Sequence, residues 1–224
     1  MNKLVSLLFV FCLLVFQSCI EIMDELTIHD DGSGTLKYAI NLSSSRVKVN
    51  SILALDSLDG EKVPNIDENK TKVSLFKKTL SLQNGISNIS ISENYVDFIF
   101  KFECDFTSID LLQEGLRKTF SITLNDKSIL ASDFSWLFWD SKVLERSVPS
   151  IATNKLNGIT ENDLSLLKTG TYTYMTRFDR GVERFENPLS KLSKDKKALM
   201  LRADTYTLKE KPSLLENTIY LIPN

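Results

Sequence analysis

The chain has 224 residues, of which 42% are hydrophobic and 25% charged, and its 27 basic and 29 acidic side chains give a formal net charge of −2. This composition is typical of a globular protein long enough to bury a sizeable core without help from disulfides. The slightly acidic balance argues against nucleic acid as a partner and against a polybasic membrane patch.

Residues 1–18 follow the pattern of a secretory signal. Lys3 precedes an apolar run of 13 residues from Leu4 to Phe16, and the polar pair Gln17 and Ser18 follows it. A permanent transmembrane helix needs about 20 apolar residues, so a run of this length favours a cleaved signal peptide over a membrane span.

The next residue, Cys19, is the expected lipid anchor. The sequence FQSC at 16–19 resembles the lipobox of bacterial lipoproteins, whose cysteine is acylated and becomes the first residue after cleavage. The usual lipobox has Leu and then Ala or Ser where this chain has Phe16 and Gln17, and the alternative is a secreted protein cut near Ser18. Two or more acyl chains, palmitate among them, give stable attachment to a membrane. We therefore expect a lipoprotein signal peptide over 1–18 and a membrane-bound chain from Cys19 onward.

Residues 21–42 alternate between apolar and polar side chains on both sides of the sequence DDGSG at 30–34. This period of two predicts a β-hairpin. Gly32 and Gly34 are expected to supply the positive φ angles of its turn. Leu26, Leu36 and their neighbours of the same parity form the predicted core face.

The remaining elements follow in chain order. Helices are predicted at 43–58, at 72–83, from a cap at 107 or 108 to about 120, and at 159–168; strands are predicted at 95–106, 133–147, 171–178, 197–205 and 217–223. This order predicts an α+β fold with an antiparallel sheet and helices packed mainly on one face. A single domain over 19–224 is the preferred organisation, and a division near residue 130 is the alternative.

Several of these segments together resemble a known family. They are the DGSG hairpin, GISNISI followed by a Phe-rich strand, SIDLLQEGL, TYTYMTRFD, VERFENPLSKLSKDKKALML and LKEKPSLLENTIYLI. Their order is similar to that of an uncharacterised family of Bacteroidota lipoproteins, and the hairpin and following helices more distantly resemble LppM-type lipoprotein domains. The resemblance implies an envelope location and an α+β fold, and it implies no catalytic activity.

Neither the single histidine nor the cysteine near the middle of the chain predicts a catalytic or metal site. His29 stands beside Asp30 and Asp31, but a turn needs polar residues for conformational reasons, and His29 falls on the solvent-facing parity. Cys104 lies among the phenylalanines of its strand, where a thiol behaves as a small hydrophobe with a raised pKa. With Cys12 removed in the signal peptide and Cys19 acylated, no disulfide partner within the chain is expected for it. No catalytic motif and no cofactor motif is present.

Three other features are candidate sites. Trp136, Phe138 and Trp139 belong to a segment that is apolar on both parities, so one face can pack in the core while the other binds a ligand or partner. We expect Trp136 and Phe138 on the core face and Trp139 nearer the surface. Ser57, in the sequence Asp-Ser-Leu at 56–58, resembles the short O-glycosylation sequon of Bacteroidota envelope proteins.

These observations predict a lipid-anchored cell-envelope protein, attached to the outer rather than the inner membrane, that acts as a non-enzymatic binding or structural module without a cofactor. Its expected partners are the membrane, through the lipid on Cys19, and an envelope protein or glycan. Two alternatives stay open: a hydrolase whose carboxylates meet only in the folded chain, and a carrier of a hydrophobic ligand.

Overall fold

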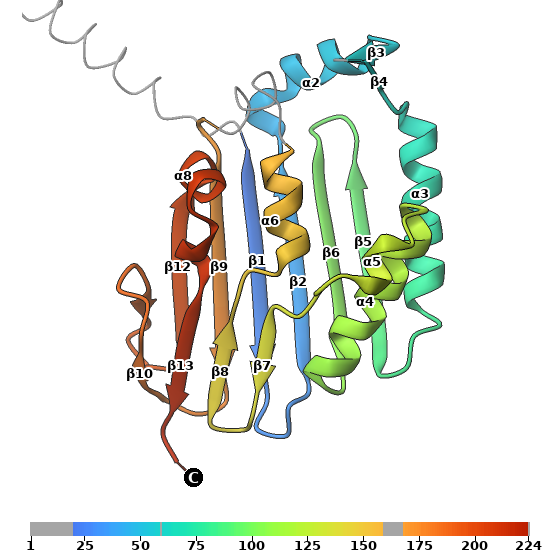
Figure 1. Cartoon of the computed structure of the whole chain (residues 1–224). Helices are drawn as coiled ribbons and strands as arrows, with labels where there is room; N and C mark the ends of the chain where they lie inside the picture. Colours follow the sequence, from blue (N-terminus) through green and yellow to red (C-terminus); the bar gives the residue numbers. More distant parts are fainter. Residues whose placement is uncertain (1–19, 59, 159–167, 224) are drawn as a thin grey trace, which may run out of the picture.

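The computed structural model describes residues 20–58, 60–158 and 168–223. A seven-stranded sheet forms one layer, with strand order β11-β12-β9-β1-β2-β6-β5 (Figure 1). Its strands are β1 (Glu21–Ile28), β2 (Gly34–Asn41), β5 (Ile86–Asn94), β6 (Ile99–Phe106), β9 (Thr171–Phe178), β11 (Lys191–Leu192) and β12 (Ala198–Asp204). The strands predicted at 171–178 and 197–205 are confirmed almost to the residue.

A second layer covers one face of this sheet. Part of it is a four-stranded antiparallel sheet, order β10-β13-β8-β7, made of β7 (Leu137–Trp139), β8 (Val143–Arg146), β10 (Val182–Phe185) and β13 (Asn217–Leu221). The other part is helical, with α3 (Ile66–Leu80), α4 (Ile109–Thr123) and α5 (Ser128–Ala131). Figure 1 shows this small sheet and α4 on the same side of the large sheet. The predicted α+β class is confirmed, and the small sheet shares the covered face with the helices.

Seven short elements complete the described chain: η1 (Ser43–Ser45), α2 (Arg46–Leu53), β3 (Ser57–Leu58), β4 (Glu61–Lys62), α6 (Ser150–Asn157), α8 (Thr205–Glu210) and η2 (Pro212–Leu215). No helix in the described part of the chain is both long and apolar enough to cross a bilayer.

The large sheet is antiparallel except at its centre. There β1 pairs with β9 in parallel, with Glu21 opposite Thr171 and Ile28 opposite Phe178. The predicted antiparallel pairing holds for the other neighbouring strands of this sheet, and this one pair departs from it. The reason is that β9 returns to the sheet only after α3, α4 and the β7–β8 hairpin, and a long connection of this kind lets a strand enter in either direction.

The predicted first hairpin is confirmed, with Glu21 opposite Asn41 and Leu26 opposite Leu36. Gly32 has the expected positive φ of 84°. The expectation for Gly34 is wrong, because this residue opens β2 and is needed for close packing instead. A Cβ atom at position 34 would lie 1.9 Å from the backbone oxygen of Thr27.

Three predicted boundaries differ from the structure. The helix expected over 43–58 ends at Leu53, because residues 57–62 form the small β3–β4 hairpin. The helix expected from 72 begins at Ile66, where Asn65 and Glu68 form a capping box. Residues 95–98 form a turn before β6, in which Phe98 has a positive φ of 54°. The helix expected at 159–168 lies almost wholly outside the described residues.

The region 133–147, expected to be one strand, forms the β7–β8 hairpin. The edge of β7 is closed by a helix side chain. The buried amide of Gln113, on α4, accepts hydrogen bonds from the backbone N–H groups of Trp136 (2.7 Å) and Leu137 (3.0 Å) and donates to the Leu137 carbonyl (3.1 Å). Gln113 therefore takes the place of a neighbouring strand and protects an edge that would otherwise be open to pairing.

One hydrophobic core extends across both sheets and α4. Leu26 of β1, Leu112 of α4 and Leu144 of β8 are all 0% exposed. Burying a leucine side chain contributes about 1.5–3 kcal/mol relative to leaving it exposed. The two sheets and α4 are therefore held together first by apolar burial.

A buried ion pair crosses this core. Asp24 of β1 and Arg146 of β8 are each 6% exposed, and the Arg146 guanidinium donates to Oδ2 of Asp24. The Tyr172 hydroxyl donates to the same oxygen at 2.9 Å. The guanidinium also lies over the Tyr174 ring, 4.3 Å from its centre. Burial opposes the guanidinium charge, but the adjacent carboxylate raises the pKa of Arg146, so the side chain stays protonated.

Breaking this pair should destabilise the chain strongly. Arg146→Met is expected to lower the free energy of unfolding by about 3–5 kcal/mol, because it leaves the Asp24 carboxylate buried without its partner. Asp24→Asn should cost a similar amount, and the double variant should lose less than the two single losses added together. Urea unfolding of the four proteins measures this coupling. Strictly additive losses would show that the pair is not coupled.

Candidate functional site

Of the three aromatic residues predicted to form a binding surface, only Phe138 is exposed. Its exposed fraction is 57%, whereas Leu137 is 5% exposed. The Trp139 indole stacks on the Phe178 ring, with centres 6.3 Å apart and planes at 18°. Trp136 packs edge-on against Phe134, with ring centres 5.6 Å apart, at the border of the helical part of the layer.

The predicted strand faces are therefore wrong at Phe138 and Trp139. Leu137 and Trp139 point toward the large sheet, and Phe138 points away from it. The prediction assumed one continuous strand beginning before Trp136. In the structure β7 has only three residues, and Trp136 precedes it with its N–H bonded to Gln113. Both indoles pack against the core.

Phe138 lies in a groove of about 740 Å³ on the outer side of the small sheet. One wall is formed by β7 and β8, which contribute Phe138 and Glu145. The opposite wall is formed by the loop 187–189 and by the segment 211–216, which contribute Leu189, Lys211 and Glu216. These segments are far apart in the sequence, so the groove exists only in the folded chain.

Two buried asparagines hold the opposite wall in place. Asn187 donates to the carbonyls of Leu214 (2.9 Å) and Glu216 (2.7 Å), and so ties the loop to the segment that follows α8. Asn217 accepts from the N–H groups of Glu186 (3.2 Å) and Asn187 (2.9 Å). Its amide donates to the Tyr174 hydroxyl at 3.2 Å, which connects the wall to the large sheet. Polar groups this well satisfied give a preformed wall.

The groove combines apolar and acidic groups. Phe138 and Leu189, 46% exposed, supply apolar surface. Glu145 and Glu216 are exposed, and neither forms an ion pair within the described residues. Glu186 is already engaged, because it accepts from the Tyr220 hydroxyl at 3.0 Å and lies 3.6 Å from Arg184. Free carboxylates beside an aromatic ring suit a ligand with several hydrogen-bond donors and one apolar face.

The sequence did not indicate that these carboxylates lie in one groove. Glu145 and Glu216 belong to β8 and to the residue before β13, and Glu145 faces outward in register with Thr218. A parity count along Val143–Arg146 would have placed Glu145 on the outer face, but only the pairing of β8 with β13 brings it near Glu216. Lys211 joins the groove because α8 ends just before it.

A second groove, of about 490 Å³, lies where α3 meets the edge strand β5. Lys77 and Lys78 of α3 and Ile86 to Ile89 of β5 line it. A β-bulge between Ser87 and Ser90 interrupts the pairing of β5 with β6, and Asn88 there has a positive φ of 51°. A bulge on an edge strand disfavours pairing with a further chain.

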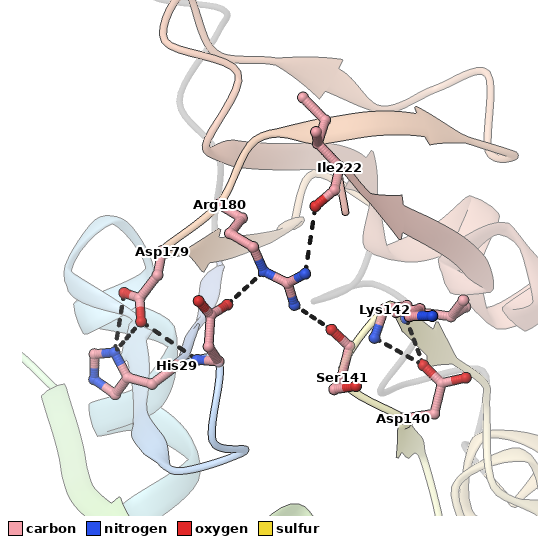
Figure 2. Close-up of polar contacts among 9 residues, drawn as sticks. His29, Asp140, Ser141, Lys142, Asp179, Arg180 and Ile222 are labelled. Atoms are coloured by element: carbon pink, nitrogen blue, oxygen red, sulfur yellow. Dashed lines mark hydrogen bonds and ion pairs between the residues drawn. The ribbon is translucent and has the colours of Figure 1, made fainter. Parts of the chain in front are cut away.

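His29 and its neighbouring acids lie at the opposite end of the sheet from the start of β1, at the hairpin tips drawn in Figure 2. The predicted turn role of Asp31 is confirmed, since its Oδ1 accepts from the N–H (2.9 Å) and hydroxyl (2.6 Å) of Ser33. His29 is exposed and its Nδ1 lies 3.1 Å from Asp179, a contact the sequence did not predict. Within the described residues, no three His, Cys, Asp or Glu side chains are placed to hold a metal ion.

Arg180 joins three of these tips. Its Nε donates to Asp30 at 2.5 Å, in the turn between β1 and β2, and another guanidinium nitrogen donates to the Ser141 carbonyl, in the turn between β7 and β8 (Figure 2). A third contact reaches the Ile222 carbonyl at 3.3 Å, after β13. The cluster around His29 is therefore a structural joint between the two sheets.

Cys104 is confirmed as a core thiol. It is 0% exposed, and burial raises its pKa to about 12, with Asp105 and Glu103 adding to the effect. A thiol with this pKa carries almost no thiolate near neutral pH and is a poor nucleophile.

Ser57 is exposed in β3, between Asp56 and Leu58, so the predicted glycosylation position is on the surface. Cys19 lies outside the described residues, which begin at Ile20.

Alanine substitutions should separate the core thiol from the surface histidine. Cys104→Ala is expected to lower the free energy of unfolding by about 1 kcal/mol or more, because it leaves a small void in the core. His29→Ala should change it by less than about 1 kcal/mol, since an exposed pair is worth little. Thermal melts of both variants check this, and the opposite order would contradict the packing described here.

No family model matches the chain, and no curated protein matches it either. Among solved structures, the chain is similar to the NMR structure of the folded domain of LppM from Mycobacterium tuberculosis. The match has 10% sequence identity, covers 92% of this chain and 91% of that chain, and has a TM-score of 0.41. The matched structure is an LppM domain, the type that the sequence more distantly resembles.

Proposed function

We propose that this chain is a lipid-anchored cell-envelope protein that binds an envelope saccharide in the groove beside Phe138. The observation that carries the binding role is the position of an exposed aromatic ring and two unpaired carboxylates, Glu145 and Glu216, in one preformed groove. Attachment to the membrane, the outer one in this proposal, rests on the signal pattern and on Cys19.

The position of β1 fits this attachment. β1 begins at Glu21, two residues after Cys19, and two residues of chain span at most about 7 Å. A lipid on Cys19 would hold the end of the large sheet where β1 begins close to the bilayer. The groove lies on the outer side of the small sheet, and Arg146 is among its lining residues. Because Arg146 contacts Asp24 in the middle of β1, the groove lies away from the end of the sheet where β1 begins. It would stay accessible to polymers beside the membrane.

The chemistry of the groove suits a saccharide. The apolar C–H face of a sugar ring can pack on Phe138, while sugar hydroxyls donate to the carboxylates and bond with nearby hydroxyls such as that of Ser147. Lys211 can donate to ring or acetamido oxygens. The ligand proposed is therefore a neutral or weakly basic oligosaccharide.

Hydrolysis is the second candidate, because the fold brings carboxylates into one groove, as a glycosidase requires. A catalytic acid needs a raised pKa, which burial against apolar groups provides. Glu145 and Glu216 are instead exposed, which favours binding over catalysis. A hydrophobic carrier would need an enclosed apolar cavity, and the groove beside Phe138 is open and partly acidic.

Removing the anchor tests the location. Cys19→Ser should abolish incorporation of labelled palmitate and release the protein from the membrane fraction, because the lipid is the proposed attachment. Fractionation and fatty-acid labelling of cells measure both effects. Labelled palmitate on the variant would refute the assignment of Cys19.

Substitutions in the groove test the ligand. Phe138→Ala and Glu145→Gln should each weaken binding of soluble neutral oligosaccharides, such as short oligomers of N-acetylglucosamine, by about 1–2 kcal/mol, roughly tenfold in Kd. Isothermal titration calorimetry is a suitable readout, because both indoles lie outside the groove and need not respond to a ligand there. Leu82→Ala is the matched control, since Leu82 is 75% exposed and not part of the groove.

The same titration separates the alternatives. New reducing ends that form with the wild-type protein and are lost in the Glu145→Gln variant would favour the hydrolase. Equal binding by wild type and both groove variants would contradict the proposed site.

A further inference from the structure

One end of the large sheet carries exposed apolar side chains that the fold does not use. This end, called here the proximal end, is where β1 begins; Glu21 pairs there with Asn41, and Asn41 with Ile99. The chain leaves it in two directions. Ile20 leads back toward Cys19, and Asn41 leads through η1 into α2. The turn between β5 and β6 lies at the same end, since the Leu42 N–H donates to the Phe98 carbonyl at 2.9 Å.

Two valines are prominent at the proximal end. Val47 of α2 is 81% exposed and Val96 of the β5–β6 turn is 73% exposed. Each valine is next in the chain to one partner of an ion pair, since the Arg46 guanidinium lies 3.4 Å from the Asp97 carboxylate. Of the large hydrophobic side chains in the described residues, only Leu82 is exposed to a comparable degree, at 75%, and it lies at the opposite end of the sheet, before β5.

The local structure does not require either valine. The β5–β6 turn is built by Asn94, whose side-chain oxygen accepts from the N–H groups of Val96 and Asp97, each at 2.9 Å. A turn tip favours Gly, Asn, Asp or Ser, so a valine there contributes nothing to the turn itself. None of the residues of α2 is buried, although Val49, Ile52 and Leu53 are half-buried. The valines thus stand out from a fixed backbone.

We infer that the proximal end rests on the lipid bilayer, with Val47 and Val96 inserted at the headgroup level. The inference builds on the proposed lipid anchor. The short stretch from Cys19 to Glu21 would place this end at the membrane. Exposed apolar side chains on a fixed backbone suit the interfacial region of a bilayer.

Such a contact would orient the domain. A single tether lets a domain tilt freely, whereas a second contact several residues away fixes its axis. The strands of the large sheet would then stand away from the bilayer, with the Arg180 joint at the distal end and the groove on the side.

Site-specific fluorescence tests the contact in the purified lipidated protein. Single variants V47C, V96C and L82C are labelled with the environment-sensitive dye NBD and reconstituted into vesicles of phosphatidylethanolamine and phosphatidylglycerol. Cys104 is buried, so the parent protein should take up little dye, and it serves as the labelling control. We expect a blue shift, and quenching by nitroxide-labelled lipid, at positions 47 and 96, with neither effect at position 82.

The outcomes separate this inference from the anchor. Protein that floats with the vesicles but shows the same emission at positions 47, 96 and 82 would overturn the bilayer contact and leave the anchor standing. Failure of the wild-type protein to float would overturn both. If the emission at position 47 is already blue-shifted in the absence of vesicles, the surface contacts a second copy of the chain, and the inference is overturned.

Discussion

The buried contact between Asp24 and Arg146 sets how the two sheets lie on one another. Apolar burial favours any close packing of two hydrophobic faces and discriminates weakly between neighbouring positions. A buried carboxylate and guanidinium tolerate only the arrangement in which they meet, because each alone would be a buried unpaired charge. Arg146 is opposite both Leu137 and Asn217 in the small sheet, so fixing Arg146 over β1 positions β7 and β13 as well. The groove beside Phe138 depends on that placement.

Other polar joints act in the same way at the borders of the small sheet. Gln113 closes the edge of β7 and connects it to α4, and Arg180 bonds to the β1–β2 and β7–β8 turns at the distal end of the sheets. Asn217 fastens the start of β13 to β9 through the Tyr174 hydroxyl. Each joint links segments far apart in the sequence. One carboxylate oxygen of the central pair, Oδ1 of Asp24, is buried without a hydrogen-bond partner among the described residues, so the pair is not fully satisfied. Such a pair supports specificity of packing more than net stability.

The sequence predicted elements well where the pattern was local. The first hairpin, β9, β12 and the Ser108-capped α4 follow from alternation, turn residues and capping, which act over a few residues. Prediction was wrong where tertiary contacts decide. The β7–β8 hairpin was predicted as one strand because its turn, at Asp140 to Lys142, lacks glycine. In the structure Ser141 adopts a positive φ of 72°, and the Asp140 side chain accepts hydrogen bonds from the N–H groups of Lys142 and Val143. The joints at Asp24, Gln113 and Arg180 gave no local signal, since a charged or amide residue in an amphipathic pattern normally faces solvent.

The same reasoning explains why the candidate site could be found only in part. Phe138 was a candidate because the segment around it is apolar on both parities, and only one of the two faces is needed for the core. Which face carries Phe138 depends on where β7 begins, and the hydrogen bonds of Gln113 set that boundary. Glu145, Lys211 and Glu216 come from three segments whose meeting depends on the Asp24–Arg146 contact and on the two asparagines behind the wall. A groove held by buried polar contacts keeps its shape before a ligand arrives, which lowers the entropy lost on binding. The buried groups that sequence analysis could not place are therefore the ones that make the exposed groups usable as a site.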